Sequence, residues 1–171
     1  MRFEKVCIEG LAYHLPDNVV TSADIENRLA PLYERLKLPQ GRLELMSGIR
    51  ERRFWDEGVF PSEVATLAGR KAITSSGIDP AQIGCLINAS VCRDFLEPST
   101  ASVIHNNLKL PSEAFVFDVS NACLGVLNGM ILVASMIEQN QILAGLVVAG
   151  ENGGPLVNHT IETLLSRTDI N

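Results

Sequence analysis

Apolar and polar positions along the chain form alternating blocks of strand length and of helix length. The continuous apolar run at 83–91 predicts a strand that is buried on both faces. Residues 61–76 carry apolar side chains at helical spacing, which predicts an amphipathic helix. By the same patterns we expect strands at 6–11, 83–91, 114–119 and 142–149, and helices at 21–37, 42–46, 61–76, 99–108, 123–137 and 159–166. Strands that alternate with helices indicate an α/β fold of right-handed βαβ units with a mostly parallel sheet.

Residues 118–137 are the most distinctive stretch, because a strand-like run turns there into a long apolar segment. From 122 to 137 only Asn128 and Ser135 are polar. A helix that is apolar on nearly all sides is expected to be buried on nearly all sides. A membrane span needs about 20 apolar residues, and the polar residues from Glu138 onward end this run too early for one. The other predicted elements hardly supply the necessary cover, so the chain looks like half of a larger structure.

Cys123 lies where the predicted strand turns into the predicted helix. The first N–H groups of a helix have no partner within it, and the positive end of the helix dipole favours a thiolate over a thiol. The thiolate is the form that attacks carbonyl groups. Cys123 is therefore a candidate nucleophile. The alternative is an ordinary buried cysteine, because free cysteines usually behave as small hydrophobic residues.

Residues 49–55 combine a dense run of charge with the only tryptophan of the chain. Arg50, Arg52 and Arg53 are the cations of this run. A guanidinium matches the geometry of a phosphate, so the three arginines are candidates for binding a phosphorylated substrate. The alternative interpretation is a solvated loop with some ion pairs.

Composition narrows the functional classes. A length of 171 residues fits about one domain, and 46% apolar with 20% charged residues is typical of a globular protein. The formal charge of −6 argues against general binding of nucleic acid. The four cysteines form no CxxC pair and the three histidines are scattered, so we expect no metal site. We also expect no signal peptide and a cytoplasmic location, because the first residues lead straight into a strand-like segment and the cysteines show no disulfide pattern.

Four segments together carry a resemblance to a known family: VCIEGLAYHLPDNVV at 6–20, GIRER at 48–52, the DxxxAC pattern at 118–123 and LAGLVVAGEN at 143–152. In this order and at this spacing they resemble the thiolase superfamily, and within it the ketoacyl synthase III branch. SVCRDFLEPSTAS at 90–102, followed by FDVSNACLGVLNGM at 117–130, looks most like the acyl-CoA condensing enzymes of bacterial long-chain olefin biosynthesis.

The resemblance implies a thiolase-like αβαβα layered fold of two similar halves. Residues 1–171 would be the N-terminal half, which carries the nucleophile, and the C-terminal half with the catalytic histidine and asparagine of the family would be absent from this chain. The counterpart of Cys123 is the residue that is acylated. The counterpart of Glu97 enters the active site of the partner subunit of a homodimer, where it is proposed to activate the second acyl chain. On residue type alone, Glu97 also fits an acid in the first turn of a helix.

The implied activity is a Cys-mediated Claisen condensation of acyl-CoA thioesters to a β-keto product, with acyl-CoA as substrate and no separate cofactor. One alternative is a 3-oxoacyl-ACP synthase III of fatty-acid biosynthesis, with acyl carrier protein as a partner. A second is a non-catalytic half that needs another chain. Ordinary ketoacyl synthase III enzymes carry a Trp and an Arg shortly before GIRER that contact coenzyme A, and the corresponding positions here lie near Arg42 and Met46. This departure fits a different acyl-CoA substrate.

Overall fold

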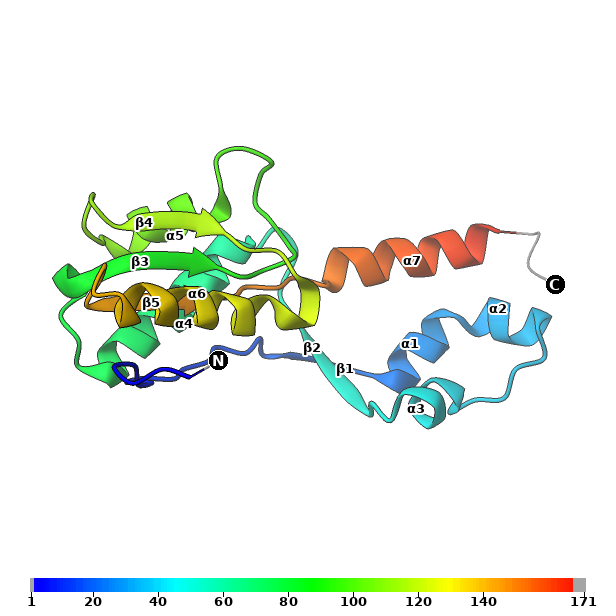
Figure 1. The fold of residues 1–171 in the computed structure, drawn as a ribbon. Helices are drawn as coiled ribbons and strands as arrows, with labels where there is room; N and C mark the ends of the chain where they lie inside the picture. Colours follow the sequence, from blue (N-terminus) through cyan, green and yellow to red (C-terminus); the bar gives the residue numbers. More distant parts are fainter. Residues whose placement is uncertain (1, 168–171) are drawn as a thin grey trace. The chain divides into compact units, whose positions relative to one another are not determined.

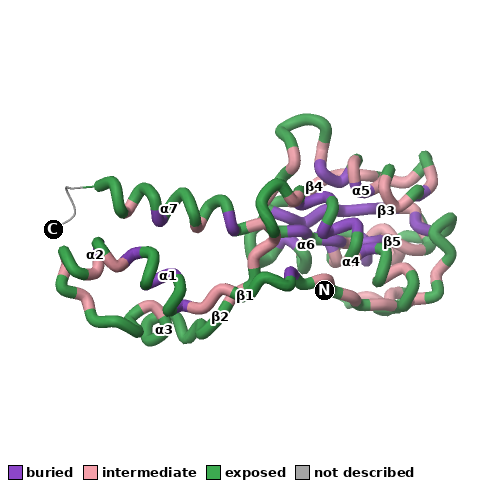
Figure 2. Tube along the Cα trace, turned by 180° about the vertical axis from the view of Figure 1, so that it is seen from behind, coloured by how far each residue is buried: buried purple, intermediate pink, exposed green. Residues whose placement is uncertain are grey.

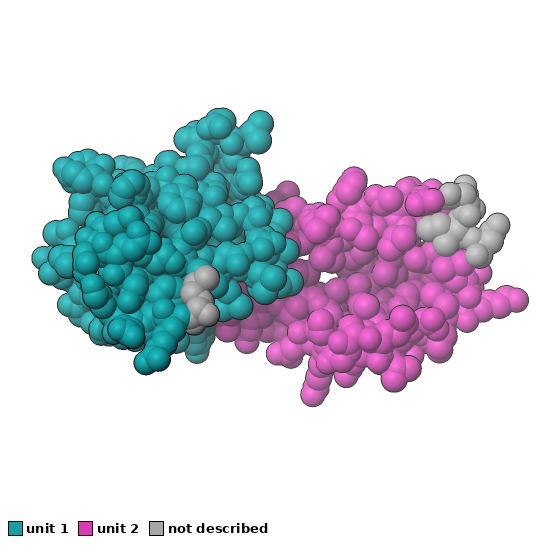
Figure 3. Space-filling view, viewed as in Figure 1, with its two compact units in different colours: residues 1–14, 59–151 teal, residues 15–58, 152–171 magenta. Residues whose placement is uncertain are grey.

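The computed structural model describes residues 2–167. The chain forms two compact units, one from residues 2–14 and 59–151 and the other from 15–58 and 152–167 (Figure 3). The first unit contains the parallel sheet together with Cys123 and Glu97. The second contains the three candidate arginines. The two units are described separately below.

The sheet of the first unit has β3 (Ile83–Asn88) at its centre, between β4 (Phe115–Asp118) and β5 (Ala144–Val148) (Figure 1). Both neighbours pair with β3 in parallel. Leu86 and Ile87 of β3 are fully buried, one on each face of the sheet. The predicted parallel sheet and its doubly buried strand are therefore confirmed. Since the strands are parallel, their carboxyl ends meet at one edge.

Helices cover both faces of this sheet (Figures 1 and 2). On one face, α4 (Pro61–Ser76) and α5 (Thr100–Leu108) pack with the strands around a buried cluster. That cluster comprises Ala65, Ile83, Leu86, Ile104, Leu110, Leu146 and Val148. On the other face, α6 (Gly125–Glu138) packs through Val133 against Cys85 and Ile87. A short 3₁₀ turn, η1 (Pro80–Gln82), leads into β3.

Helix α6 is buried on one face only, which corrects the expectation that it is buried on nearly all sides. Its buried residues are Gly125, Gly129, Val133 and Ala134. The opposite side exposes the large apolar residues Val126, Leu127, Ile131 and Leu132, each at least 39% exposed, and Leu124 just before the helix is 54% exposed. The helix is as apolar as its sequence indicates, but the sheet packs against only one side of it. Among the described residues, no helix is long and apolar enough to cross a membrane.

The segment at 6–11 does not form the predicted buried strand. It is irregular, and Ile8 and Leu11 are 62% and 79% exposed. Just before it, the amides of Glu4 and Lys5 donate to Oε2 of Glu138, both at 3.0 Å. An apolar run becomes a strand only where it pairs with a sheet edge. Here a side chain on α6 takes the neighbouring amides instead.

The second unit has a two-stranded antiparallel ladder, β1 (Asn18–Thr21) with β2 (Glu51–Phe54). Its helices are α1 (Ser22–Arg28), α2 (Ala30–Arg35), α3 (Arg42–Ser47) and α7 (Gly154–Ser166). Ile25, Leu29, Leu32 and Ile161 form its core. The helix predicted at 21–37 is split at Leu29. The reason is Pro31, which lacks an N–H and therefore favours the first turn of a new helix over the interior of a continuous one. Helix α7 also starts earlier than predicted.

A buried carboxylate organises the start of α3. Glu26 is 1% exposed and accepts hydrogen bonds from the amides of Leu43 and Gly41, both at 2.6 Å, and from the Tyr33 hydroxyl at 3.1 Å. The bond from Leu43, assisted by those from Gly41 and Tyr33, lowers the pKa of Glu26 although burial opposes this shift. The charged form of Glu26 therefore stabilises this unit.

We expect Glu26→Gln to lower the free energy of unfolding at pH 7 by about 1–3 kcal/mol, because an amide leaves one buried donor without an acceptor. Since folding lowers the pKa, the contribution of Glu26 is complete above the ordinary glutamate pKa of about 4.3 and is lost as the pH falls through the folded-state value. Thermal unfolding between pH 7 and pH 3 measures this. The gap between the two proteins should narrow at acid pH, and the exposed Glu34→Gln serves as the control. A gap that is independent of pH would contradict this role.

Candidate active site

Cys123 lies in the 3₁₀ turn η2 (Ala122–Leu124), which joins β4 to α6 at the carboxyl edge of the sheet. Its side chain is exposed. The preceding residue, Ala122, has φ +43°, a left-handed conformation that is uncommon for a residue with a Cβ. The side-chain amide of Asn121 donates to Oδ1 of Asn128 at 2.6 Å and links the turn to the first part of α6. A strained residue next to a reactive group is common at functional sites.

Gly125 brings the start of α6 directly onto the end of β3. A Cβ at this position would lie 2.6 Å from the carbonyl oxygen of Ala89 and 3.4 Å from that of Val119. Only a residue without a side chain allows this approach. Cys123 is two residues before Gly125. The close packing of Gly125 against Ala89 therefore fixes the distance between the turn that carries Cys123 and the end of β3.

We expect Gly125→Ala to push the start of α6 away from β3. The free energy of unfolding should fall by about 1–3 kcal/mol, as for other overpacked sites, and acylation of Cys123 should slow. Chemical denaturation and mass spectrometry of the acylated protein measure the two effects. Gly153→Ala is the matched control, because a Cβ there would meet no atom within 4 Å. Equal behaviour of the two variants would contradict this role of Gly125.

Polar side chains connect the carboxyl ends of the three strands close to this turn. Asn88 and Ser90 are buried, and the hydroxyl of Ser90 donates to Oδ1 of Asn88 at 2.7 Å. The amide of Gly150, after β5, donates to the Ser90 hydroxyl at 2.7 Å, and Nδ2 of Asn88 donates to Oδ1 of Asp118 at 3.1 Å. Asn88 and Ser90 were not predicted as site residues, because the stretch 83–91 reads as one apolar run. Their position at the carboxyl end of a parallel strand was the available signal.

Glu97 lies in the loop between β3 and α5, which projects from the first unit (Figure 1). Its side chain is exposed, and a cis peptide bond joins it to Pro98. The N-cap of α5 is Ser99, whose hydroxyl accepts from the amide of Ser102 at 3.3 Å. Glu97 therefore precedes the cap, and the interpretation of Glu97 as an acid of the first helical turn is wrong. Beside it, Leu96 is 85% exposed.

The base of the Glu97 loop is held firmly although its tip is exposed. The carboxylate of Glu151 accepts from the amides of Val91 and Cys92 at 2.6 and 3.0 Å. Oδ1 of Asp94 accepts from the amide of Ser62 at the start of α4, at 2.9 Å. These contacts attach the loop to the end of β5 and to α4. The loop thus presents Glu97 from an anchored base.

The three candidate arginines differ in their surroundings. Arg52 and Arg53 are neighbours in β2, so their side chains leave opposite faces of the strand. Nη2 of Arg52 donates to the Ser22 hydroxyl at 3.0 Å, while its buried Nη1 has no partner within the described residues. Nη1 of Arg53 donates to the carbonyl of Pro16 at 2.9 Å. Arg50 is exposed. The interpretation of 49–55 as a solvated loop is wrong, because most of it forms β2.

The four cysteines differ in how accessible they are as thiolates. Cys85 is fully buried, which raises its pKa to about 11. Cys7 is exposed, but its thiol donates to Oε1 of Glu9 at 2.9 Å, and this hydrogen bond raises its pKa. Cys92 is half-buried and Cys123 is exposed. Exposure therefore favours Cys123 over Cys85 and Cys92, and the pKa of Cys7 works against its reaction.

We expect brief treatment of the intact protein with iodoacetamide at neutral pH to label Cys123 first. Cys85 is shielded, and Cys7 holds its proton more tightly because of Glu9. Mass spectrometry of the digested protein identifies the labelled residue. Faster labelling of Cys7, Cys85 or Cys92 would remove the support for Cys123 as the nucleophile.

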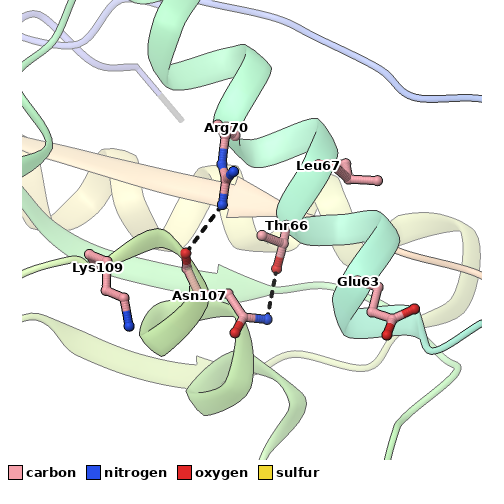
Figure 4. Close-up of a pocket in the computed structure, with 6 residues that line it drawn as sticks. All are labelled: Glu63, Thr66, Leu67, Arg70, Asn107 and Lys109. Carbon is pink, nitrogen blue, oxygen red and sulfur yellow. Dashed lines mark hydrogen bonds between the residues drawn. The ribbon is translucent and has the colours of Figure 1, made fainter.

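An open pocket lies between α4 and α5, and none of the predicted site residues lines it (Figure 4). Nη2 of Arg70 donates to the carbonyl of Asn107 at 3.4 Å, and Nδ2 of Asn107 donates to the Thr66 hydroxyl at 3.4 Å. Glu63 and Lys109 complete its charged rim. No group of three His, Cys, Asp or Glu residues within 2–167 is arranged to hold a metal ion.

Known proteins resemble the chain along nearly all of its length. No protein-family model matches it. The acyl-CoA:acyl-CoA alkyltransferase of Shewanella oneidensis is 43% identical over 166 residues, covering 97% of this chain and 48% of that protein. A β-ketoacyl-[acyl-carrier-protein] synthase III of Koribacter versatilis is 31% identical over 153 residues, covering 90% of this chain and 44% of that protein. The chain thus spans about half the length of the curated relatives it matches.

Solved structures give the same result. Crystal structures of Xanthomonas campestris OleA, with either a single glutamate or a single cysteine replaced, match with a TM-score of 0.94 and 42% identity. Each match covers 99% of this chain and 49% of the OleA chain. The predicted thiolase-like α/β fold is therefore confirmed. By sequence and by fold the chain is a homologue, over about half of their length, of acyl-CoA:acyl-CoA alkyltransferases and of X. campestris OleA, in agreement with the resemblance to the ketoacyl synthase III branch of the thiolase superfamily.

Proposed function

We propose that this chain supplies the nucleophile-bearing half of an acyltransferase that condenses two acyl-CoA thioesters to a β-keto product. The observation that carries the proposal is the position of Cys123, exposed in a strained turn at the carboxyl edge of a parallel sheet, in a chain 43% identical to an acyl-CoA:acyl-CoA alkyltransferase. In parallel α/β sheets, ligands bind at this edge. Acyl-CoA is the substrate, and the chemistry needs no further cofactor.

The first step is transfer of an acyl group to Cys123. The thiolate attacks the thioester carbonyl, the bond between the carbonyl carbon and the CoA sulfur breaks, and CoA leaves as a thiolate that takes up a proton. The developing oxyanion needs fixed hydrogen-bond donors. The backbone N–H of Cys123, at the start of the 3₁₀ turn, is our candidate for one of them.

The second step forms the carbon–carbon bond. The carboxylate of Glu97 takes a proton from the carbon next to the carbonyl of a second acyl-CoA. The resulting carbanion attacks the acyl-Cys123 carbonyl, the bond to the Cys123 sulfur breaks, and the thiolate is restored. The product is a β-ketoacyl-CoA. Hydrolysis of its thioester by water then gives a β-keto acid and CoA.

The placement of Cys123 and Glu97 supports these roles. In the X. campestris OleA structures, the replaced glutamate and the replaced cysteine are separated by the same number of residues as Glu97 and Cys123 are here. Glu97 lies on a projecting loop whose tip exposes Phe95 and Leu96, at 50% and 85%. Such a loop suits contact with a second subunit, so we propose that Glu97 acts in the site of the partner in a homodimer.

We further propose that a second, similar half completes the site and covers the exposed side of α6. The lengths of the relatives and the apolar residues on that side support this. Arg50, Arg52 and Arg53 remain our candidates for the phosphates of coenzyme A; Arg50 and Arg53 are exposed, whereas Arg52 is partly buried. The free cysteines fit a reducing, cytoplasmic compartment.

A second candidate function is that of a 3-oxoacyl-ACP synthase III, because a relative of that name is 31% identical. One experiment tests both. The complete enzyme, meaning this chain with its second half, is given acyl-CoA alone or acyl-CoA with malonyl-ACP, and β-keto product and CoA release are measured. Product from acyl-CoA alone supports acyl-CoA condensation. Product only with malonyl-ACP supports the second function, and no product in either case would refute both.

A further inference from the structure

The buried hydroxyl of Thr100 closes the Glu97 loop. Oγ1 of Thr100 accepts from the amide of Asp94 at 3.2 Å, which joins the two ends of the segment that carries Glu97. Thr100 is fully buried, whereas the tip between these ends is exposed. The position of this tip therefore depends on where Thr100 is held.

Asp118 holds Thr100 from the strand that leads to Cys123. Its Oδ2 accepts from the amide of Thr100 at 3.1 Å, and its Oδ1 accepts from the amide of Ala101 at 2.9 Å. Oδ1 also accepts from Nδ2 of Asn88 at 3.1 Å. The carboxylate thus meets the first amides of α5, where a negative charge is favoured by the helix dipole. Both of its oxygens are used.

These contacts connect the two residues of the proposed reaction. Asp118 is the last residue of β4, and the turn with Cys123 begins four residues later, at Ala122. Through Thr100, the same carboxylate sets the base of the loop that carries Glu97. We propose that Asp118 and Thr100 form a clamp that positions Glu97 for the condensation step. The inference rests on the proposed function, and both are positioning residues because neither touches the reacting atoms.

Asp118→Asn tests the bond to Thr100 with little change in shape. An amide oxygen in the place of Oδ1 keeps the bonds to Ala101 and Asn88, but the NH₂ group then faces the amide of Thr100, donor against donor. Thr100→Val removes the hydroxyl that closes the loop, and Thr100→Ser keeps it. Asp79→Asn and Thr74→Val are matched controls, since Asn also serves as an N-cap at Asp79 and the Thr74 hydroxyl donates to the carbonyl of Arg70 within the same helix, α4.

Acylation and condensation are measured separately in the complete enzyme, by mass spectrometry of acyl-Cys123 and by β-keto product. We expect Asp118→Asn and Thr100→Val to lower condensation roughly 10²-fold, as expected when a reacting group is misplaced by about 1 Å. Acylation should stay within about threefold of wild type, and Thr100→Ser should restore condensation. Equal losses in both steps, or unchanged condensation, would overturn the clamp. If Asp118→Asn does not fold, the comparison of Thr100→Val with Thr100→Ser tests the clamp by itself.

Mixed dimers provide a second readout that a purely structural defect would not give. Asp118→Asn mixed with Cys123→Ala should regain condensation, because one site then combines an intact Cys123 with an undisturbed Glu97 loop. Asp118→Asn mixed with Glu97→Ala should not, because no site has both. Recovery in the second mixture would overturn the clamp. A wild-type enzyme that neither acylates nor condenses would instead refute the proposed function itself.

Discussion

Glu97→Ala should leave acylation of Cys123 nearly unchanged and lower condensation by about 10²–10⁴-fold, the usual contribution of a positioned base. The two steps use different groups. Thioester exchange needs the thiolate and hydrogen bonds to the oxyanion, and Glu97, on a separate projecting loop, supplies neither. Rapid-quench mass spectrometry of acyl-Cys123 and assay of the β-keto product measure the steps independently.

The subunit that uses Glu97 can be identified by mixing variants. If Glu97 acts in the partner's site of a two-fold dimer, Glu97→Ala and Cys123→Ala protomers should regain activity when mixed, because one site of the mixed dimer contains both intact residues. Neither parent homodimer has such a site. Exchange of subunits without recovery would remove the role in the partner's site. An unimpaired Glu97→Ala enzyme would favour the 3-oxoacyl-ACP synthase III alternative.

Residues 1–171 expressed by themselves should show no condensation activity and should self-associate. The reason for association is the exposed side of α6, where Leu127 is 54% and Leu132 is 42% exposed, together with Leu124 just before the helix, which is 54% exposed. Contiguous apolar surface of this kind drives association. The reason for inactivity is that the histidine and asparagine expected for the reaction lie in the proposed second half. Analytical ultracentrifugation and an assay for β-keto product measure the two effects.

Polar substitution on that side should reverse the association. We expect Leu127→Gln combined with Ile131→Gln to yield a monomer at concentrations where the parent chain associates. Leu143→Gln is the matched control, since Leu143 is 80% exposed but lies outside α6. A monomeric parent chain, or turnover of acyl-CoA to a β-keto product by the chain alone, would contradict the proposed need for a second half.

Periodicity was sufficient to predict the parts of the fold in which each residue's environment follows from its immediate neighbours. The apolar run of β3 and the amphipathic α4 are examples, and the turn with Cys123 between β4 and α6 was placed correctly from the change of pattern alone. The family resemblance added the thiolase-like fold, which the structural matches confirm. The roles of Cys123 and Glu97 remain predictions.

Features that depend on distant partners were not predicted. β2 is dense in charge and reads as a loop, yet it pairs with β1, a strand far earlier in the chain. The bonds from Thr100 and Asn88 to Asp118 cannot be inferred from spacing, because each joins residues brought together by the sheet. For the segment at 6–11 the error is the reverse, because a strand was predicted that does not form. Its pattern suits a strand, but no ladder in the described chain includes it.

The Glu97 loop combines an anchored base with an exposed tip, so its surface can change without a change in the fold that holds it. The anchors are Glu151, Asp94 and Thr100, all outside the tip. At the tip, Leu96 is 85% exposed, whereas the ring of Phe95 packs against that of Phe60 with their centroids 5.8 Å apart. Substitutions of Leu96 or Glu97 should therefore cost little folding free energy while they alter the surface offered to a neighbouring molecule. Related chains can therefore differ in the surface of this short segment while the scaffold that anchors it stays unchanged.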